Sequence, residues 1–239
     1  MSSRTIFILI LSLLPWVVSA QSKQDKRTCR ILFIAPQSGA PQTLHLFDGS
    51  TVQKVELGRM SFSPVYELAT GDIKIALLAE PPKPGAGNRL PAIPDGAPQV
   101  AVREAITDFY LILSSDPENK VAPVRVQLVN ANADGFKNGQ MMWYNLTDSL
   151  VGGIVGSRKL RIKPNSREIL DAPATGDTDY PVKIHYVPAG SQHTEPVCET
   201  RWIHDPRSRG VFFILKDHGS IAPRIIGIPD YREKPDRDS

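Results

Sequence analysis

The chain alternates apolar and polar residues with a period of two, in short segments that proline and glycine interrupt. Val182, Ile184 and Tyr186, for example, alternate with Lys183 and His185. Alternation of this kind places one set of side chains on a buried face and the other in water, which is typical of an antiparallel sheet with one solvated side. The 239 residues include 21 prolines and 17 glycines, and these residues interrupt long helices. The sequence therefore predicts an all-β fold of short strands joined by turns.

Three segments recur in the same order along the chain, which indicates an internal duplication. The matched pairs are Cys29–Ala35 with Val124–Asn130, Ala69–Asp72 with Ala174–Asp177, and Phe109–Leu113 with Val211–Leu215. Their offsets of 95, 105 and 102 residues differ only by the length of a short loop. We expect about seven strands in each unit, with turns roughly every ten residues, which is the rhythm of an immunoglobulin-like sandwich.

The predicted organisation is two tandem immunoglobulin-like β-sandwich domains after a signal peptide. The first domain is placed at residues 29–116 and the second at 121–229, with a polar, proline-containing linker at 114–120. The tail 230–239 combines charged residues with almost no apolar ones, so we expect it to be disordered.

Two further segments have a predicted place within these domains. Residues 81–98 hold many prolines and glycines and are expected to form a long surface loop, with 188–206 as the equivalent loop of the second domain. The apolar runs 109–113 and 211–215 suit central strands that are covered on both faces.

Residues 1–20 have the pattern of a secretory signal peptide. Arg4 precedes the apolar run Ile6–Leu14, and Val18-Ser19-Ala20 places small or tolerated residues at a cleavage site. The alternative is an uncleaved membrane anchor, for which the apolar run is short compared with the roughly 20 residues of a membrane span. We expect an exported protein, periplasmic or secreted, with no integral membrane segment after cleavage.

Charge and motifs favour a protein without catalytic chemistry. The formal net charge of +3 is too small to predict nucleic-acid binding. The sequence contains no Gly-x-Ser-x-Gly elbow, phosphate-cradling loop or dinucleotide fingerprint, so we predict no cofactor and no enzymatic activity. The basic stripe Arg158, Lys159, Arg161 and Lys163 is interpreted as the solvated face of an edge strand; a ligand for it would have to be anionic.

The segment Trp202–Gly210 is the densest group of polar side chains, and four of its residues are candidate binding residues: Trp202, His204, Arg207 and Arg209. His204 beside Asp205 suggests acid–base chemistry, and the two arginines suggest a grip on a carboxylate or phosphate. The alternative is a strand that ends at Trp202, followed by a charged turn. We favour the turn, because neighbouring residues of a strand point to opposite faces.

Cys29 and Cys198 are the only cysteines, and export permits a disulfide between them. Such a bond would join the two domains; the alternative is two small buried side chains or unpaired thiols. For a metal site the candidate ligands are His185, His193, Glu195, Cys198 and His204. Their spacing matches no compact ligand signature, so no metal site is predicted.

Residues 43–75 resemble a family of exported bacterial immunoglobulin-like β-sandwich domains of unknown function. The resemblance lies in the segments Thr43–Gly49, Leu57–Leu68 and Thr70–Ile75. It implies an immunoglobulin-like fold and a location in the cell envelope, and it brings no catalytic residues.

These observations lead to three functional hypotheses. The first is an exported, non-enzymatic binding or structural protein of the cell envelope, whose partner is an envelope protein or a surface glycan. The second is a periplasmic two-domain assembly chaperone that donates a strand to an incomplete partner. The third is an exported hydrolase that uses His204 and Asp205.

Overall fold

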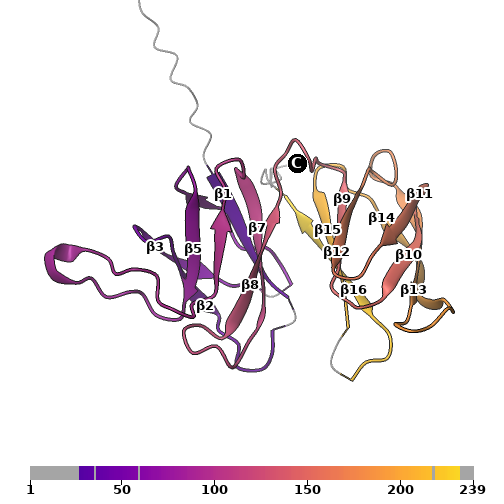
Figure 1. Cartoon of the computed structure of the whole chain (residues 1–239). Coiled ribbons are helices and arrows are strands. Elements are labelled where there is room, and N and C mark those ends of the chain that lie inside the picture. The colour runs from indigo at the N-terminus through magenta and orange to yellow at the C-terminus, as the bar shows by residue number, and fades with distance from the viewer. Residues whose placement is uncertain (1–26, 35, 59, 217–218, 232–239) are drawn as a thin grey trace, which may run out of the picture.

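The structure is a computed structural model that describes residues 27–34, 36–58, 60–216 and 219–231. The predicted signal peptide at 1–20 and the predicted tail residues 232–239 lie outside these ranges. The described residues form two β-sandwiches that lie side by side (Figure 1). A 3-10 turn, η1 (Ala86–Asn88), is the helical element assigned in them. In these ranges we find no helix with the length and apolar character that crossing a membrane requires.

The first sandwich contains eight strands in two four-stranded sheets. The strands are β1 (Arg27–Phe33), β2 (Thr43–Phe47), β3 (Val52–Glu56), β4 (Tyr66–Leu68), β5 (Ile73–Leu78), β6 (Gln99–Val102), β7 (Asp108–Ser115) and β8 (Val124–Asn130). Sheet A has the order β4-β1-β7-β8, and sheet B has the order β3-β2-β5-β6.

The second sandwich also contains eight strands. They are β9 (Met141–Asn145), β10 (Leu150–Val155), β11 (Arg158–Ile162), β12 (Ser166–Leu170), β13 (Asp179–Val187), β14 (Glu195–Ile203), β15 (Arg209–Leu215) and β16 (Arg224–Asp230). Sheet C has the order β12-β9-β15-β16, and sheet D has the order β11-β10-β13-β14.

The two sandwiches have the same topology, because each sheet of the second repeats the strand order of the first with every strand number raised by eight. The correspondence includes the parallel pairs β1–β7 and β9–β15; the other pairs are antiparallel. The predicted all-β fold of two tandem sandwiches is confirmed, with eight strands in each domain instead of about seven.

The division between the sandwiches differs from the predicted one. The predicted linker at 114–120 is the turn between β7 and β8, and β8 pairs with β7 from Phe109↔Asn130 to Ser115↔Val124. β8 therefore completes sheet A, and the chain passes to the second sandwich between residues 130 and 141. A polar turn with proline joins strands of one sheet here, a role that its composition does not distinguish from that of a domain linker.

Two other predicted boundaries are wrong, and one loop is confirmed. Strand β14 occupies Glu195–Ile203, inside the region predicted as the loop 188–206. The sequence did not indicate this strand, because an exposed edge strand shows little alternation of apolar and polar residues. Asp230 was assigned to a disordered tail, yet it ends β16 and is fully buried. The loop predicted at 81–98 does lie between β5 and β6 and extends from the first sandwich (Figure 1).

The four sheets stack in the order B, A, C, D, with an apolar core between each neighbouring pair. Sheets A and B enclose the first core, and sheets C and D enclose another. Between sheets A and C lies a third core, which Tyr110 and Ile112 of β7 share with Val211 and Phe213 of β15. The predicted central strands are confirmed, since alternate residues of β7 and β15 enter different cores. The predicted edge position of the basic stripe is confirmed as well, because the stripe lies on β11, which is an edge strand of sheet D.

The two domains face each other through equivalent sheets with the strand order reversed. At one side Arg167 of β12 donates to the Asn130 carbonyl of β8 at 3.1 Å. At the other side Arg30 of β1 pairs with Asp230 of β16. The interface therefore brings β8 close to β12 and β1 close to β16.

Candidate binding site

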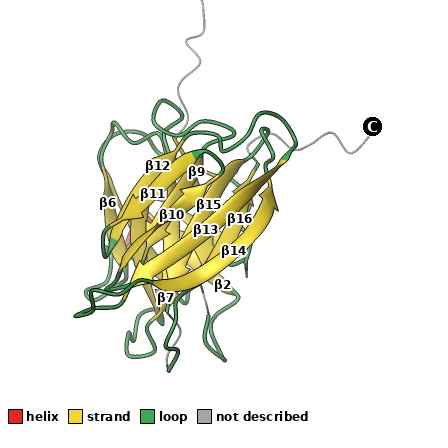
Figure 2. Ribbon diagram, turned by 90° about the vertical axis from the view of Figure 1, so that its right-hand side faces the viewer, coloured by secondary structure: helices red, strands yellow, loops and turns green. Residues whose placement is uncertain are grey.

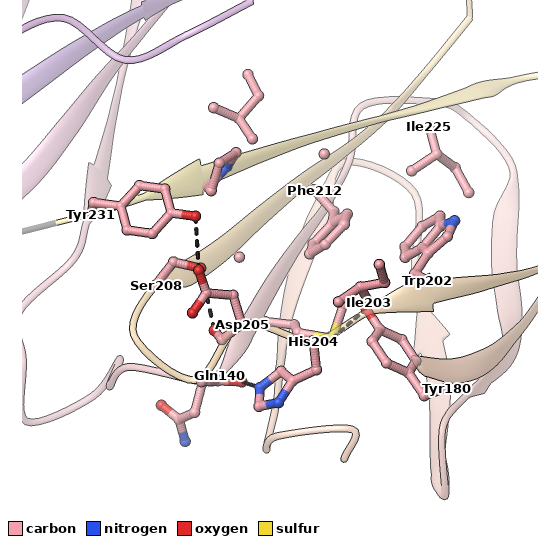
Figure 3. Close-up of a pocket in the computed structure, with 16 residues that line it drawn as sticks. Gln140, Tyr180, Trp202, Ile203, His204, Asp205, Ser208, Phe212, Ile225 and Tyr231 are labelled. Atoms are coloured by element: carbon pink, nitrogen blue, oxygen red, sulfur yellow. Dashed lines mark hydrogen bonds between the residues drawn. The ribbon is translucent and has the colours of Figure 1, made fainter. Parts of the chain in front are cut away.

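One side of the second sandwich is open between β14 and β16. In the first sandwich the equivalent strands β6 and β8 lie against each other and close that side. In the described residues β14 and β16 make no contact of that extent, and a cavity of about 510 Å³ lies between sheets C and D. We call it the open-side groove; its lining comes from the ends of β14 and β16, the start of β15 and the linker before β9 (Figure 3).

Aromatic rings form one wall of the open-side groove. Trp202 of β14 stacks on Phe212 of β15 with ring centroids 5.2 Å apart and an interplanar angle of 5°. Phe212 in turn stacks on the fully buried Trp143 of β9 at 4.6 Å. Stacked rings of this kind contribute about 0.5–1.5 kcal/mol per pair beyond the area that they bury. The wall is therefore continuous with the core of the second domain.

Two glycines hold Phe212 in this position. A Cβ atom on Gly210 or on Gly227 would lie 2.6 Å from the Phe212 ring, closer than van der Waals contact allows. Gly227 is the cross-strand partner of Phe212 in β16. The bare backbone at both positions lets the ring lie across them toward Trp202.

His204 lines the groove just after β14, and each of its ring nitrogens lies within hydrogen-bond distance of a backbone carbonyl oxygen. Its Nε2 is 3.0 Å from the Gly139 carbonyl and its Nδ1 is 3.1 Å from the Gly176 carbonyl. Neither ring nitrogen faces Asp205, so the acid–base pair on which the hydrolase hypothesis depends is not assembled. His204 instead joins the interdomain linker to the loop before β13.

Asp205 belongs to the rim of the groove. Its carboxylate accepts hydrogen bonds from the Arg207 side chain, from the Arg207 amide and from the Tyr231 hydroxyl at 2.8 Å. The Arg207 side chain, followed by these other donors, lowers the pKa of Asp205 to about 2. The predicted charged turn is present here, and its carboxylate holds the end of β16 against the start of β15 (Figure 3).

Tyr180 faces the groove from β13 and is buried. Its hydroxyl lies 3.9 Å from the Met141 sulfur, a weak acceptor. Burial raises the pKa of Tyr180 to about 12, so the phenol stays neutral at physiological pH and contributes apolar surface.

Arg209 lies away from the groove, in the interface between the domains. Its guanidinium donates to Asp230 at 2.7 Å, to Asp108 at 3.1 Å and to the Ala131 carbonyl at 2.8 Å. Tyr110 donates its hydroxyl to the same Asp230 oxygen at 2.6 Å. A guanidinium with this many partners within the protein positions the domains; it is not available to an external anion.

The structure thus separates the four predicted binding residues. Trp202 and His204 line the open-side groove, Arg207 projects from its rim into solvent, and Arg209 is buried in the interface. Groove residues that the sequence did not single out as binding candidates include Tyr180, Phe212, Ile225, Ile228 and Tyr231. Gly210 and Gly227, which contact the Phe212 ring, could have pointed to this residue in the sequence. Their role is recognisable only once the pairing of β15 with β16 is known.

The cysteines do not form the disulfide that was considered. Cys29 is buried in the core of the first domain, whereas Cys198 lies in β14 of the second, and no bond joins them. Of the residues considered as metal ligands, no three gather at one place in the part of the chain that the structure describes.

Comparisons with known proteins return little. No protein-family model matches the chain, and no curated protein matches it. Among solved structures it is similar to a "putative cell adhesion protein" from Bacteroides ovatus ATCC 8483, at 9% sequence identity and a TM-score of 0.22. The match covers 88% of this chain and 99% of that one. A similarity of this size says nothing about what either protein binds.

Proposed function

We propose that the protein is an exported, non-enzymatic binding protein that holds an extended segment of a partner polypeptide of the cell envelope in the open-side groove. One observation carries the proposal: the equivalent side is closed by β6 and β8 in the first domain and open between β14 and β16 in the second. Because the second domain is open where the first is closed, apolar side chains of its core are accessible to a partner.

An added β-strand is the occupant that suits the groove. β14 is a nine-residue edge strand. Among the described residues it pairs with β13 alone, so its outer backbone groups can pair with a further strand. β14 and β16 each contain one proline, which removes a backbone donor. Pro196 lies near the start of β14 and outside the groove, whereas Pro229 of β16 lies in the groove lining, so β14 is the better template. An extended peptide paired with β14 would direct every second side chain toward Trp202 and Phe212.

The same feature distinguishes this proposal from the assembly-chaperone alternative. A chaperone of that kind donates a strand, whereas the open-side groove accepts one. The partner is therefore expected to supply a segment in which apolar residues alternate.

Selection from a phage-displayed peptide library tests the proposal with matched variants. Ile203 is 80% exposed at the end of β14, and Ile221 is 86% exposed in the loop before β16. Ile203→Lys places a charge at the mouth of the groove, and Ile221→Lys makes the same change elsewhere. We expect selected peptides to alternate apolar residues, to bind wild type and Ile221→Lys equally, and to lose affinity for Ile203→Lys.

Hydrogen exchange then locates the peptide. Binding should slow exchange of the β14 amides and leave those of β6, the equivalent strand of the first domain, unchanged. The proposal is wrong if no alternating sequence is enriched, if Ile203→Lys binds as well as wild type, or if β14 gains no protection.

A further inference from the structure

The outer face of sheet D, directed away from the domain core, carries a second concentration of chemistry. Figure 2 views the molecule from the side of the second domain. A shallow hollow of about 630 Å³ lies over β10, β11 and β13. Four of its lining residues are basic or imidazole side chains, which together we call the basic face: Lys159, Arg161, Lys183 and His185.

Strand register arranges the basic face in two rows. Gly152 of β10 pairs with Arg161 on one side and with His185 on the other. Two residues further along β10, Ile154 pairs in the same way with Lys159 and Lys183. Neighbouring strands lie about 4.8 Å apart and alternate residues about 7 Å apart, so the four side chains start from the corners of a rectangle of roughly 10 by 7 Å.

Few acidic groups neutralise these rows. Glu199 of β14 pairs with Lys183 at 3.1 Å. Lys159 and Arg161 have no ion-pair partner within 4 Å among the described residues. The sequence has a nearly balanced charge, but the fold gathers cations on this one surface.

The floor between the rows is flat and aliphatic. A Cβ atom on Gly152 would lie 3.0 Å from His185 Nε2, so the glycine leaves room for the imidazole to lie over the strand. Ile154 is 48% exposed, and Leu150 and Val187 complete the floor. A ligand can therefore contact apolar surface and the surrounding cations together.

The first domain provides an internal comparison. On the equivalent outer face of sheet B, Phe47, Ala76 and Leu78 are buried under Leu90 and Ile93 of the β5–β6 loop. In the second domain the equivalent β13–β14 turn spans only 188–194, and the face stays uncovered.

We infer that the basic face binds an acidic polysaccharide, independently of the open-side groove. The cationic side chains Lys159, Arg161 and Lys183, spaced along two strands of one face, match a linear chain that carries anionic groups at intervals. The aliphatic floor suits the C–H surfaces of sugar rings. The lining contains no Phe, Tyr or Trp side chain, the rings on which nucleic-acid bases stack most often and which anchor proteins in the bilayer interface.

The test measures binding of heparin, a sulfated polysaccharide, by titration calorimetry of the mature protein at low ionic strength. Lys159→Gln with Arg161→Gln removes one side of the basic face. The matched control is Lys54→Gln with Lys74→Gln, two exposed lysines of sheet B. We expect about tenfold weaker binding for the first pair, no change for the control pair, no binding of neutral dextran, and weaker binding as salt rises.

Vesicles of phosphatidylglycerol and phosphatidylcholine form the second arm. The inference is overturned if heparin does not bind, if both double variants weaken binding equally, or if vesicles bind more tightly than heparin through the same residues. The Ile203→Lys variant, which alters the open-side groove, should bind heparin as wild type does, so the failure of either proposal can be recognised separately.

Discussion

Arg209 and Asp230, which face each other across β15 and β16, form an ion pair at 2.7 Å with side chains that are 3% and 0% exposed. Asp230 also accepts from Arg30 and from Tyr110 of the first domain. One buried carboxylate thus joins side chains from both domains. Its negative charge balances the guanidinium groups of Arg30 and Arg209 in the interface.

Replacing Asp230 with Asn tests this dependence. The amide preserves the shape but leaves Arg30 and Arg209 without their shared counter-charge. Removing one partner of a buried pair costs about 3–5 kcal/mol, and we expect that loss in the free energy of unfolding measured with urea. Asp179→Asn, in an exposed pair with Arg201, is the control and should change little. A similarly small loss in Asp230→Asn would contradict the role of the carboxylate.

The core between sheets A and C predicts that the domains unfold together. Phe213 is 1% exposed in that core, where its ring lies 5.8 Å from that of Tyr144. Differential scanning calorimetry of wild type should show one transition. Phe213→Ala should lower stability by about 3–5 kcal/mol, whereas Val65→Ala, at a half-exposed position, should not. Two separate transitions in wild type would contradict the shared core.

Periodicity predicted the fold class because an alternating strand has only one way to bury its apolar side. The duplication was also visible, since the segments before β5 and β13 and the runs in β7 and β15 do occupy equivalent places. The match of Cys29–Ala35 with Val124–Asn130 was wrong: β1 corresponds to β9, and β8 to β16. Strands share a composition, so similarity alone does not identify equivalent ones.

The match of Phe109 with Val211 shows a second limit. Phe109 enters the core of its own domain, whereas Val211 enters the core between the domains. A shift of one residue exchanges the two faces of a strand, and a strand that is apolar on both faces does not reveal such a shift. The groove and the basic face were only partly visible for a related reason. The sequence indicated Trp202 and His204 of the groove and Lys159 and Arg161 of the basic face, but the remaining members join them through cross-strand pairing.

His204 should stabilise the linker between the domains. His204→Ala removes the contacts to the Gly139 and Gly176 carbonyls and leaves these oxygens without the imidazole, at a cost of about 1–3 kcal/mol. The Gly139 amide, which donates to the Ser208 carbonyl at 2.8 Å, should exchange faster with deuterium. Arg207→Ala is the control on the exposed side of the same turn, and equal exchange in both variants would contradict the prediction.

Acid should release the end of β16 from the turn. The pKa of Asp205 is about 2 in the folded protein, below its ordinary value of 3.8. The contribution of the carboxylate is therefore complete above pH 3.8 and is lost as the pH falls through 2. NMR of the Tyr231 ring should follow this loss. In Asp205→Asn the acid-dependent change should be absent; an unchanged titration would show that another group holds Tyr231.

The two cysteines should react as separate thiols of different accessibility. Burial raises the pKa of the Cys198 thiol, which lowers its thiolate fraction at neutral pH and slows alkylation. Cys29 is 0% exposed, so it should react only when the first domain unfolds. Mass spectrometry after iodoacetamide treatment should find slow modification of Cys198 in the native protein and modification of both residues in urea. The Cys198→Ser variant should remain unmodified until it unfolds. Recovery of a Cys29–Cys198 peptide would contradict the structure, because the two side chains lie in different domains.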